Sequence, residues 1–315
     1  MKKVLVTGGA GAIGSRLVSK LCSNYDVLVL DDLSSGYFDN LEGLGVRFWR
    51  GSVTDDEILK EVFAERPSII CHLAANFANQ NSVDYPQKDL LVNGMGTLKM
   101  LQYAHEIDVE RFIYSSSSCV YGNNGGLLSE KTCSHSLDTP YAITKYLGEQ
   151  YVNFFYMHHG TPTVILRFFN SYGPGEYPGK YRNVIPNFMY NVLKGLPIKI
   201  TGQGTETRDF TFVDDTIQAI LLAMSHKEAI GKTFNTGTGI ETSIKELIEA
   251  VQETCDRRVP TEYVPPRNWD TVKRRCSDIS FARDTFGYSP TTDLRRGLRK
   301  TYDWFLKNKV TSRYI

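Results

Sequence analysis

The sequence has little excess charge of either sign and no long apolar run. Its 315 residues carry a formal net charge of +1, which gives no electrostatic reason to expect a nucleic acid or an anionic membrane as a partner. The longest apolar runs fall far short of the roughly 20 residues that a membrane-spanning helix needs. The N-terminus enters a strand-like run at once, which leaves no room for a signal peptide. With 41% hydrophobic and 23% charged residues, the composition predicts an ordinary soluble protein.

Metal-binding and disulfide motifs are missing as well. The six cysteines occur without a CxxC pair, and the six histidines occur without an HExxH motif. Scattered cysteines are typical of reduced thiols in a cytosolic protein, so we expect no disulfide, no metal site and a cytoplasmic location. The cysteines are Cys22, Cys71, Cys119, Cys133, Cys255 and Cys276.

The first 32 residues contain a dinucleotide-binding signal. The apolar run 3–7 precedes a glycine-rich segment, 8–14, and a helical pattern then leads to a second apolar run, 26–30, that ends in Asp31 and Asp32. Glycines let the backbone approach a pyrophosphate, whose charge is met by N–H groups at the helix N-terminus. A carboxylate after the second strand suits the adenosine ribose hydroxyls. Because no arginine directly follows this carboxylate, the sequence favours NAD over NADP, whose extra phosphate the carboxylate would repel.

Strand-like runs alternate with helical patterns through the first half of the chain. Runs at 46–51, 68–75 and 111–115 are separated by helical segments, an interval that is typical of βαβ units and a parallel sheet. We therefore predict an α/β fold, a Rossmann-type doubly wound parallel sheet with a smaller C-terminal α/β domain that binds the substrate. Ligands are expected beyond the carboxyl ends of the strands.

A change of composition at Asn170 predicts a domain boundary. From this residue glycine, proline, tyrosine and asparagine are frequent, and a helix is hard to sustain there. We expect an NAD-binding domain over 1–169 and mainly a nucleotide-sugar-binding domain over 170–315. A segment near 210–240 is expected to return to the main sheet.

Three features occur in an order that is hard to obtain by chance. Four serines open the segment 115–122 at the end of a strand, Tyr141 and Lys145 share one face of a helix, and Asn170 ends the next strand. Because the charge of Lys145 lies beside Tyr141, we expect it to lower the phenol pKa from about 10 and to make a usable base. The same Tyr-x-x-x-Lys spacing at Tyr190 is interpreted as ordinary surface spacing.

Over nearly its whole length the chain resembles the extended short-chain dehydrogenases/reductases, and among them the NAD-dependent nucleotide-sugar epimerase/dehydratase family, most of all its 4-epimerases. The resemblance implies NAD as the cofactor and a nucleotide sugar as the substrate. The landmarks that carry it are Thr7–Gly14, Asp31–Gly36, His72–Ala75, Asn93, Ser115–Gly122, Tyr141 with Lys145, Arg167–Asn170, Arg208–Phe210, Val213–Asp215 and Arg267–Asp270.

The resemblance also implies residue roles. Tyr141 is the base that takes the sugar hydroxyl proton, Lys145 holds the nicotinamide ribose and tunes Tyr141, and Ser117 hydrogen-bonds the reacting oxygen. The implied cofactor-binding residues are Gly8, Gly11, Ala12, Ile13, Gly14, Asp31, Asp32, Ser35, Gly36, Ser52, Val53, Leu73, Ala74, Ala75, Asn93, Ser115, Tyr141, Lys145 and Phe168. The implied substrate-binding residues are Ser117, Ser118, Tyr141, Asn170, Asn183, Val184, Arg208, Arg267 and Asp270.

Departures from the family pattern reduce the number of reactions and substrates that the resemblance allows. Dehydratases carry an Asp-Glu pair, and decarboxylases a glutamate, where this chain has Ser118 and Cys119. Epimerases of UDP-glucuronate usually have threonine and arginine at the positions of Asn170 and Tyr177. The position that helps 4-epimerases limit the hexose substituent is Arg274, an unusual large cation that leaves the sugar open. The Gly-Asp pair that usually meets the adenine is Gly-Ser here, which weakens one cofactor contact.

Together these observations predict a homodimeric, cytoplasmic, NAD-dependent nucleotide-sugar 4-epimerase that acts on a UDP-hexose. The helix over 141–158 carries several large apolar side chains, and a dimer contact is one interpretation of them besides packing on the sheet. The alternatives are another nucleotide-sugar-modifying member of the family, such as a dehydratase, decarboxylase or reductase, and a non-catalytic sensor of NAD or nucleotide sugars.

Overall fold

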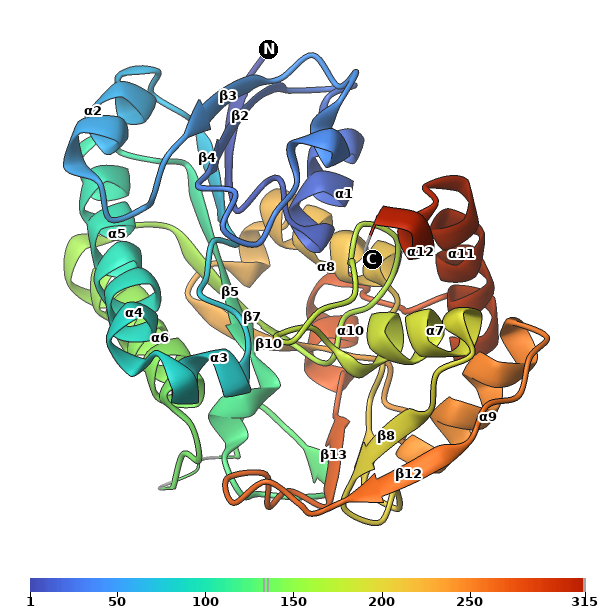
Figure 1. The fold of residues 1–315 in the computed structure, drawn as a ribbon. Helices are drawn as coiled ribbons and strands as arrows, with labels where there is room; N and C mark the ends of the chain where they lie inside the picture. The colour runs from blue at the N-terminus through green and yellow to red at the C-terminus, as the bar shows by residue number, and fades with distance from the viewer. Residues whose placement is uncertain (133, 135, 314–315) are drawn as a thin grey trace.

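The computed structural model describes residues 1–132, 134 and 136–313, so Cys133 lies outside the described residues. One parallel sheet of seven strands organises this part of the chain (Figure 1). Side by side, its strands are β10 (Lys232–Thr236), β7 (Thr163–Phe168), β5 (Arg111–Ser117), β4 (Ile69–His72), β1 (Lys3–Thr7), β2 (Asp26–Asp31) and β3 (Arg47–Arg50). The chain order reverses between β1 and β4, where a doubly wound fold opens a crevice for ligands. The Rossmann-type prediction is confirmed.

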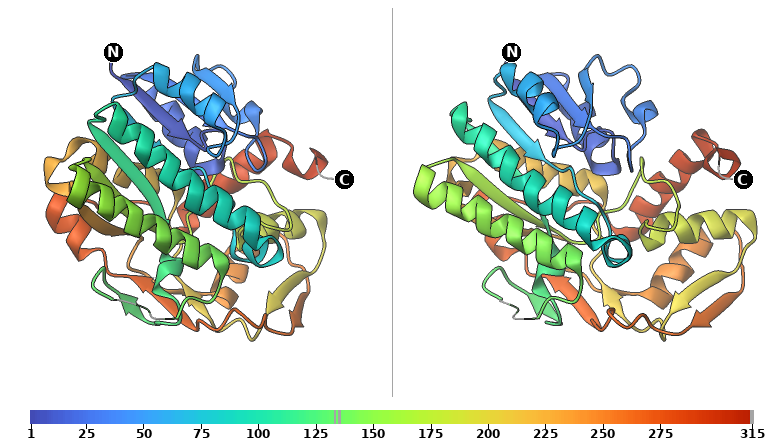
Figure 2. Two further views of the ribbon diagram at one scale, coloured as in Figure 1. Left: turned by 90° about the vertical axis from the view of Figure 1, so that its left-hand side faces the viewer. Right: turned by 60° about the vertical axis from the view of Figure 1, so that its left-hand side comes forward.

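Helices cover both faces of this sheet because the strand side chains alternate between them. Val4 and Val6 pack with α1 (Ala12–Leu21) and α8 (Val213–Ser225) in one core cluster. Leu5 points the other way, into a second core cluster. That cluster is completed by α2 (Asp56–Ala64), α5 (Gly96–Glu106) and α6 (Pro140–His159). Both views of Figure 2 show α5 and α6 running side by side along this face.

The helical segment between β4 and β5 is interrupted. The structure has α4 (Pro86–Asp89), a π-helical turn over Leu90–Met95, and only then α5. A π turn inserts one extra residue per turn and shifts the faces of the helix. Here it carries Asn93 into the interior, where the side chain is buried.

The second lobe is built mainly from residues after 170 (Figure 1). It contains a pair of strands, β8 (Ile198–Thr201) and β12 (Thr261–Val264), and a small sheet in which β13 (Arg274–Ser277) lies between β9 (Thr207–Arg208) and β6 (Leu127–Leu128). The remaining described elements are α3 (Asn79–Asp84), α7 (Val184–Lys194), β11 (Thr242–Ser243), α9 (Ile244–Thr254), α10 (Ser280–Phe286), α11 (Leu294–Lys307), α12 (Val310–Arg313) and short 3-10 turns at Phe38–Leu41, Ser118–Tyr121 and Lys227–Ala229.

Between the two lobes the chain crosses more than once. After β7 it enters the second lobe, and it comes back through α8 and β10, which extends the main sheet next to β7. On this topology we propose the division at residues 169 and 170, with the segment near 210–240 belonging to the first lobe.

Two general features complete the fold. No helix in the described ranges is both long enough and apolar enough to cross a membrane. The five described cysteines are free thiols, and the same part of the chain contains no cluster of three potential metal-ligating side chains.

Candidate active site

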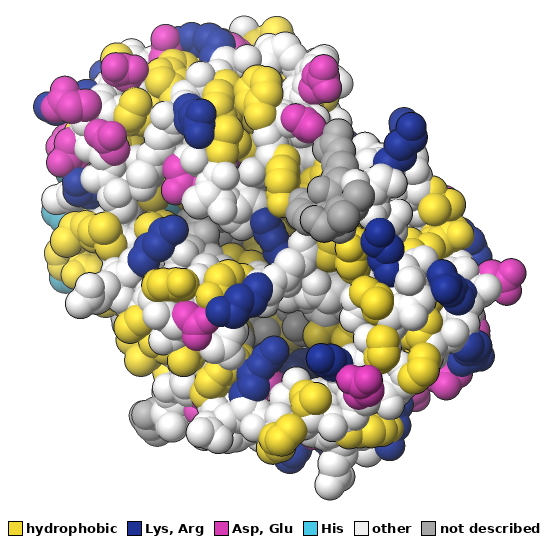
Figure 3. Space-filling view, in the orientation of Figure 1, with side chains coloured by type: hydrophobic (Ala, Val, Ile, Leu, Met, Phe, Trp, Pro, Cys, Tyr) yellow, Lys and Arg dark blue, Asp and Glu magenta, His cyan; other side chains and the backbone are white. Residues whose placement is uncertain are grey.

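A cavity of about 630 Å³ opens between the two lobes, at the carboxyl ends of the parallel strands. Figure 3 shows this hollow in the middle of the molecule, with lysine and arginine side chains around it. Every residue that the sequence assigned to catalysis, cofactor or substrate lines the cavity, with the exception of Asn93. Segments that are far apart in the sequence therefore converge on one site.

The glycine-rich loop between β1 and α1 has the geometry of a dinucleotide cradle. A Cβ at Gly8, whose φ is +69°, would lie 2.8 Å from the backbone nitrogen of Ala74. A Cβ at Gly14 would lie 2.1 Å from the carbonyl oxygen of Gly8. The helix begins at its N-cap, Gly11, without a side-chain cap, so its first N–H groups are free for an anion such as a pyrophosphate.

Asp31 ends β2 at the adenosine side of this cradle. Its carboxylate accepts hydrogen bonds from the backbone N–H groups of Ala10 at 2.9 Å and Leu33 at 2.8 Å. Burial raises the pKa of Asp31, and these two N–H groups oppose that rise. The carboxylate thus holds the glycine-rich loop to the β2 end, where ribose hydroxyls are expected. These residues fit a dinucleotide.

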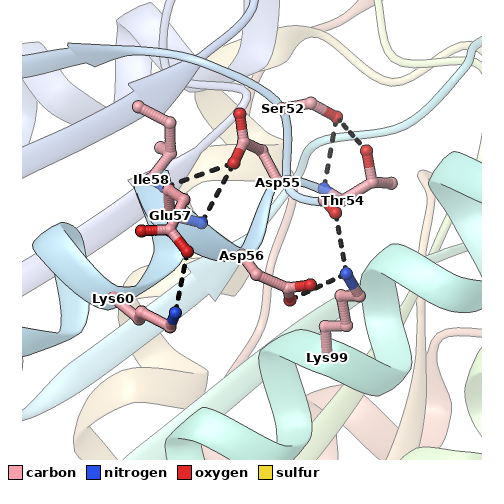
Figure 4. A network of polar contacts seen from close by, with 8 residues as sticks. All are labelled: Ser52, Thr54, Asp55, Asp56, Glu57, Ile58, Lys60 and Lys99. Atoms are coloured by element: carbon pink, nitrogen blue, oxygen red, sulfur yellow. Dashed lines mark hydrogen bonds and ion pairs between the residues drawn. The ribbon is translucent and has the colours of Figure 1, made fainter.

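Ser52 occupies the expected adenine end of the cavity. Figure 4 shows how its hydroxyl is used, pairing with the Thr54 hydroxyl at 2.8 Å and accepting from the Thr54 N–H at 3.2 Å. Lys99 of α5 then fixes this loop, because its ammonium donates to the Thr54 carbonyl oxygen at 2.8 Å and pairs with Asp56 at 2.7 Å. A serine in place of the usual aspartate therefore shapes the loop and offers no charge to an adenine.

Asn93 does not reach the cavity. The side-chain oxygen Oδ1 of Asn93 accepts from the backbone N–H of Asn76 at 2.7 Å, and the side-chain nitrogen Nδ2 donates to the carboxylate of Asp89 at 2.9 Å. The π turn directs this side chain beneath the loop that follows β4, so the implied direct cofactor contact is corrected to support of the loop at residues 74–76.

The implied catalytic residues lie together at the strand end of β5. Thr139 caps α6, accepting from the N–H of Ala142 at 3.2 Å, and Tyr141 therefore lies in the first helical turn. One turn later Lys145 donates to the carbonyl oxygen of Ser115 at 2.7 Å, and its ammonium lies 5.8 Å from the centre of the Tyr141 ring. The Ser117 side chain lies near enough to Tyr141 to lower the pKa of its phenol.

The electrostatics of this trio differ from the expectation. Burial raises the pKa of the Tyr141 phenol well above its usual value, and the Ser117 side chain opposes this only in part. Burial also lowers the pKa of Lys145 to about 8, while the nearby carboxylate of Asp89 acts in the other direction. In the chain alone, desolvation of the buried phenol dominates, so the pKa of Tyr141 is raised although Lys145 lies beside it.

A buried ion pair supports the serine strand from behind. Glu149 of α6 accepts from Nε of Arg167 at 2.9 Å, from Nη2 of the same side chain at 2.7 Å, and from the hydroxyl of Ser116. Arg167 also donates to the hydroxyl of Tyr121 at 3.0 Å. Since Ser116 lies between Ser115 and Ser117, this network fixes the end of β5 on which both depend.

Polar groups of the second lobe face the catalytic trio across the cavity. Asn170 has a φ of +35° and donates to the carbonyl oxygen of Asp209 at 2.9 Å, a backbone position that asparagine tolerates better than most residues. Arg208 pairs with Asp270 at 3.3 Å, and Arg267 lies over the Trp269 ring. These arginines, with the start of α7 at Asn183 and Val184, can receive a diphosphate and its ribose.

Arg274, the position that the resemblance assigned to the sugar substituent, does not face the cavity. Strand residues alternate in side, and Arg274 points outward, where its 63% exposed side chain pairs with Glu241 at 2.9 Å. The next residue, Arg275, lines the cavity instead. Tyr177 is buried between Tyr37 and Trp304 and does not line the cavity either, so its identity does not report on the sugar.

Sequence reasoning missed several lining residues for want of a motif. Asn79 lies on α3, accepts from Thr139 at 2.8 Å and donates to the sulfur of Cys119 at 3.5 Å. Glu176 is buried, and burial raises its pKa to about 7. A lone asparagine or glutamate in a loop gives no periodic signal, so only the fold shows that these side chains face the cavity.

Comparison with known proteins identifies the class. A model of the NAD dependent epimerase/dehydratase family matches residues 4–237. The UDP-glucose 4-epimerase of Mycolicibacterium smegmatis is 34% identical over 313 residues, which cover 98% of this chain and 99% of that protein. The relatives also include dTDP-glucose 4,6-dehydratases and a UDP-N-acetyl-alpha-D-glucosaminuronate decarboxylase.

Solved structures agree with this match. An epimerase from the methanogen Methanothermobacter thermautotrophicus has a TM-score of 0.97 and 47% identity, covering 99% of this chain and 95% of that chain. A UDP-glucose 4-epimerase of Thermus thermophilus, solved with NAD, has a TM-score of 0.90 and 32% identity, covering 96% and 99% respectively.

The chain belongs to the NAD-dependent epimerase/dehydratase family. It is a nucleotide-sugar enzyme with NAD as its cofactor, on a Rossmann-type fold whose glycine cradle and Asp31 fit that dinucleotide.

Proposed function

We propose that this protein is an NAD-dependent nucleotide-sugar 4-epimerase that acts on a UDP-hexose. The observation that carries the proposal is the composition of the β5 strand end within the cavity. Ser117 and Tyr141 both line the cavity there, but the two residues after Ser117 are Ser118 and Cys119, which offer no carboxyl group for dehydration or decarboxylation. NAD, when bound, supplies a reversible hydride acceptor, which is enough for epimerisation through a 4-keto sugar.

In this proposal the residues of the chain move one proton and hold the sugar. Tyr141 takes the proton of the C4 hydroxyl and returns it after the 4-keto sugar has turned over. Ser117 hydrogen-bonds the reacting oxygen, and Lys145 keeps a positive charge beside the phenol, which favours the phenolate. Arg208 and Arg267 hold the diphosphate, so that the sugar turns while its nucleotide stays bound.

We further infer that the enzyme works as a homodimer in the cytoplasm. The outer side of α6 exposes Ile143, Tyr146, Phe154 and Met157, the last with 72% of its surface accessible. The neighbouring π turn exposes Leu91 as well. Exposed apolar side chains of this number on one helix layer support a contact with a second copy. Free thiols at the five described cysteines support a reducing compartment.

The proposal is tested by proton NMR of the purified protein, without added NAD, on UDP-glucose, UDP-galactose and their N-acetyl forms. Interconversion of a pair is the expected result. A keto-deoxy product would show that the enzyme is a dehydratase and refute the proposal.

Tyr141→Phe should lower turnover by about 10²–10⁴-fold while NAD stays bound, because only the proton acceptor is removed. The matched control is Tyr190→Phe, in the second Tyr-x-x-x-Lys pair, which lies on α7. Unlike Tyr141, Tyr190 does not line the cavity. Equal turnover of Tyr141→Phe and the wild type would contradict the assigned base.

A further inference from the structure

We propose that Arg275 determines substrate specificity by binding a carboxylate on the hexose, so that the preferred substrate is a nucleotide hexuronate. The inference rests on the proposed function for the place of the sugar. It concerns a residue that has no role in the proton transfer.

The strand β13 brings Arg275 to the sugar side of the cavity. In the parallel register of β13 with β9, Arg275 pairs with Arg208, so the two residues lie side by side at the cavity wall. Nη1 of Arg275 lies 3.9 Å from the sulfur of Cys119, which is two residues after Ser117. The guanidinium therefore lies beside the place where the hexose must sit to reach Ser117 and Tyr141.

The guanidinium of Arg275 has only one strong acceptor among the described residues. Only 8% of the residue is exposed, and Nη2 donates to the carbonyl oxygen of Gly122 at 2.7 Å. Nη1 has the thiol of Cys119, a weak acceptor, and the buried Nε has no partner. Among the described residues no carboxylate forms an ion pair with Arg275. A buried charge is costly when it is not paired, so an anion that enters beside Cys119 is strongly favoured.

Other buried arginines of this chain show what is missing. Arg167 has the bidentate partner Glu149. Arg111 has no acid, but one of its nitrogens donates to two carbonyl oxygens, at 2.6 and 2.9 Å, and it lies away from the cavity. Arg275 has one carbonyl oxygen and lines the cavity, so Nη1, whose partner is the weak acceptor Cys119, is available to a ligand.

The charges around Arg275 favour an anion. Arg208 lies next to it, and the charge of Arg275 disfavours the charge of Arg208. Asp138 also lines the cavity and feels the charge of Arg275, but burial still raises the pKa of this carboxyl. Arg208 already has Asp270 and the expected diphosphate. A planar carboxylate matches the fork of a guanidinium, and a neutral hydroxymethyl group offers it no charge.

The test measures binding of UDP-glucuronate, UDP-glucose and UDP to the purified NAD-containing enzyme by calorimetry. Wild type should bind UDP-glucuronate more tightly than UDP-glucose. Arg275→Gln should weaken binding of UDP-glucuronate by about 10- to 100-fold and change UDP-glucose and UDP by less than about twofold. Arg275→Lys should restore part of the loss. Arg274→Gln is the matched control, because that neighbour points outward, and it should leave all three affinities unchanged.

Three outcomes would overturn the inference. Equal weakening of all three ligands by Arg275→Gln would assign the residue to the diphosphate, and no weakening would remove it from the site. A fall in the melting temperature of the ligand-free variant, together with equal loss for all ligands, would show a structural role only. Binding is separate from turnover, so a split between charged and neutral sugars without any interconversion would retain this inference and refute the 4-epimerase.

Discussion

Replacing Glu149 by glutamine should be among the most destabilising conservative changes in this protein. Only 2% of the Glu149 side chain and 9% of the Arg167 side chain are exposed, and the pair is joined by two hydrogen bonds. Glutamine has nearly the same shape, but it carries no charge. Its amide group would also direct N–H donors at the donors of Arg167.

The size of the effect follows from burial. Removing one partner of a buried ion pair leaves the other charge unpaired in a low-dielectric environment, which costs about 3–5 kcal/mol. Arg167 keeps only the hydroxyl of Tyr121 and a long contact to the Glu130 carbonyl oxygen at 3.4 Å, neither of which carries a charge. We therefore expect Glu149→Gln to lower the free energy of unfolding by about 3–5 kcal/mol.

The free energy of unfolding is measured by urea denaturation at neutral pH, followed by circular dichroism. The matched control is Glu249→Gln, which breaks the exposed pair of Glu249 with Arg258 and should cost far less, because water screens both charges. The double variant Glu149→Leu, Arg167→Met replaces both charges by apolar groups and should be more stable than Glu149→Gln.

Two results would refute this reasoning. One is a loss for Glu149→Gln no larger than that of the exposed control. The other is a double variant that is less stable than Glu149→Gln, which would mean that the charges stabilise the fold beyond compensating one another.

Three further predictions follow from single features of the structure. Gly14→Ala should weaken NAD binding at least about tenfold, because the added Cβ would lie 2.1 Å from a backbone carbonyl oxygen. The control Gly179→Ala, whose Cβ would lie 3.5 Å from the nearest atom, should bind NAD as the wild type does. Equal NAD content of the two purified variants would contradict this prediction. Met157→Glu should give a monomer in analytical ultracentrifugation, and Leu196→Glu, at an exposed leucine elsewhere, should not; an unchanged mass would refute the α6 contact. Burial lowers the pKa of His72 to about 3, so the unfolded state takes up a proton below about pH 6.5 and the folded state does not, and stability falls as the pH falls through this range. His72→Gln should remove about 2 kcal/mol of the stability lost between pH 7.5 and pH 5.0 in urea unfolding, and an unchanged pH dependence would contradict the buried neutral imidazole.

Much of the fold and the site could be predicted from local signals. The apolar run at residues 3–7, the glycines after it and the acid at Asp31 are contiguous or evenly spaced, and each is read by a rule of short range. The spacing of Tyr141 and Lys145 also needs only the period of a helix. The residues that these local rules identified, among them Gly14, Asp31, Tyr141 and Lys145, line the same cavity in the structure.

What could not be predicted depends on side-chain direction and on burial. A strand of four residues, β13, decides that Arg275 faces the cavity and Arg274 does not, and no periodic signal marked that strand. Likewise, one π turn moves Asn93 beneath a loop. The pKa of Tyr141 is set by burial, which depends on packing from several segments, and a sequence motif does not contain that information.

The position of β10 at the edge of the main sheet has a consequence for synthesis of the protein. The 63 residues 169–231, which build part of the second lobe, separate β7 from its outer neighbour. At about 5–20 residues per second, the ribosome needs about 3–13 s to make them, and for that time the edge of β7 is unpaired in the nascent chain. The sheet is thus closed only after part of the second lobe has emerged, and a pause in translation within 169–231 would prolong exposure of an aggregation-prone edge.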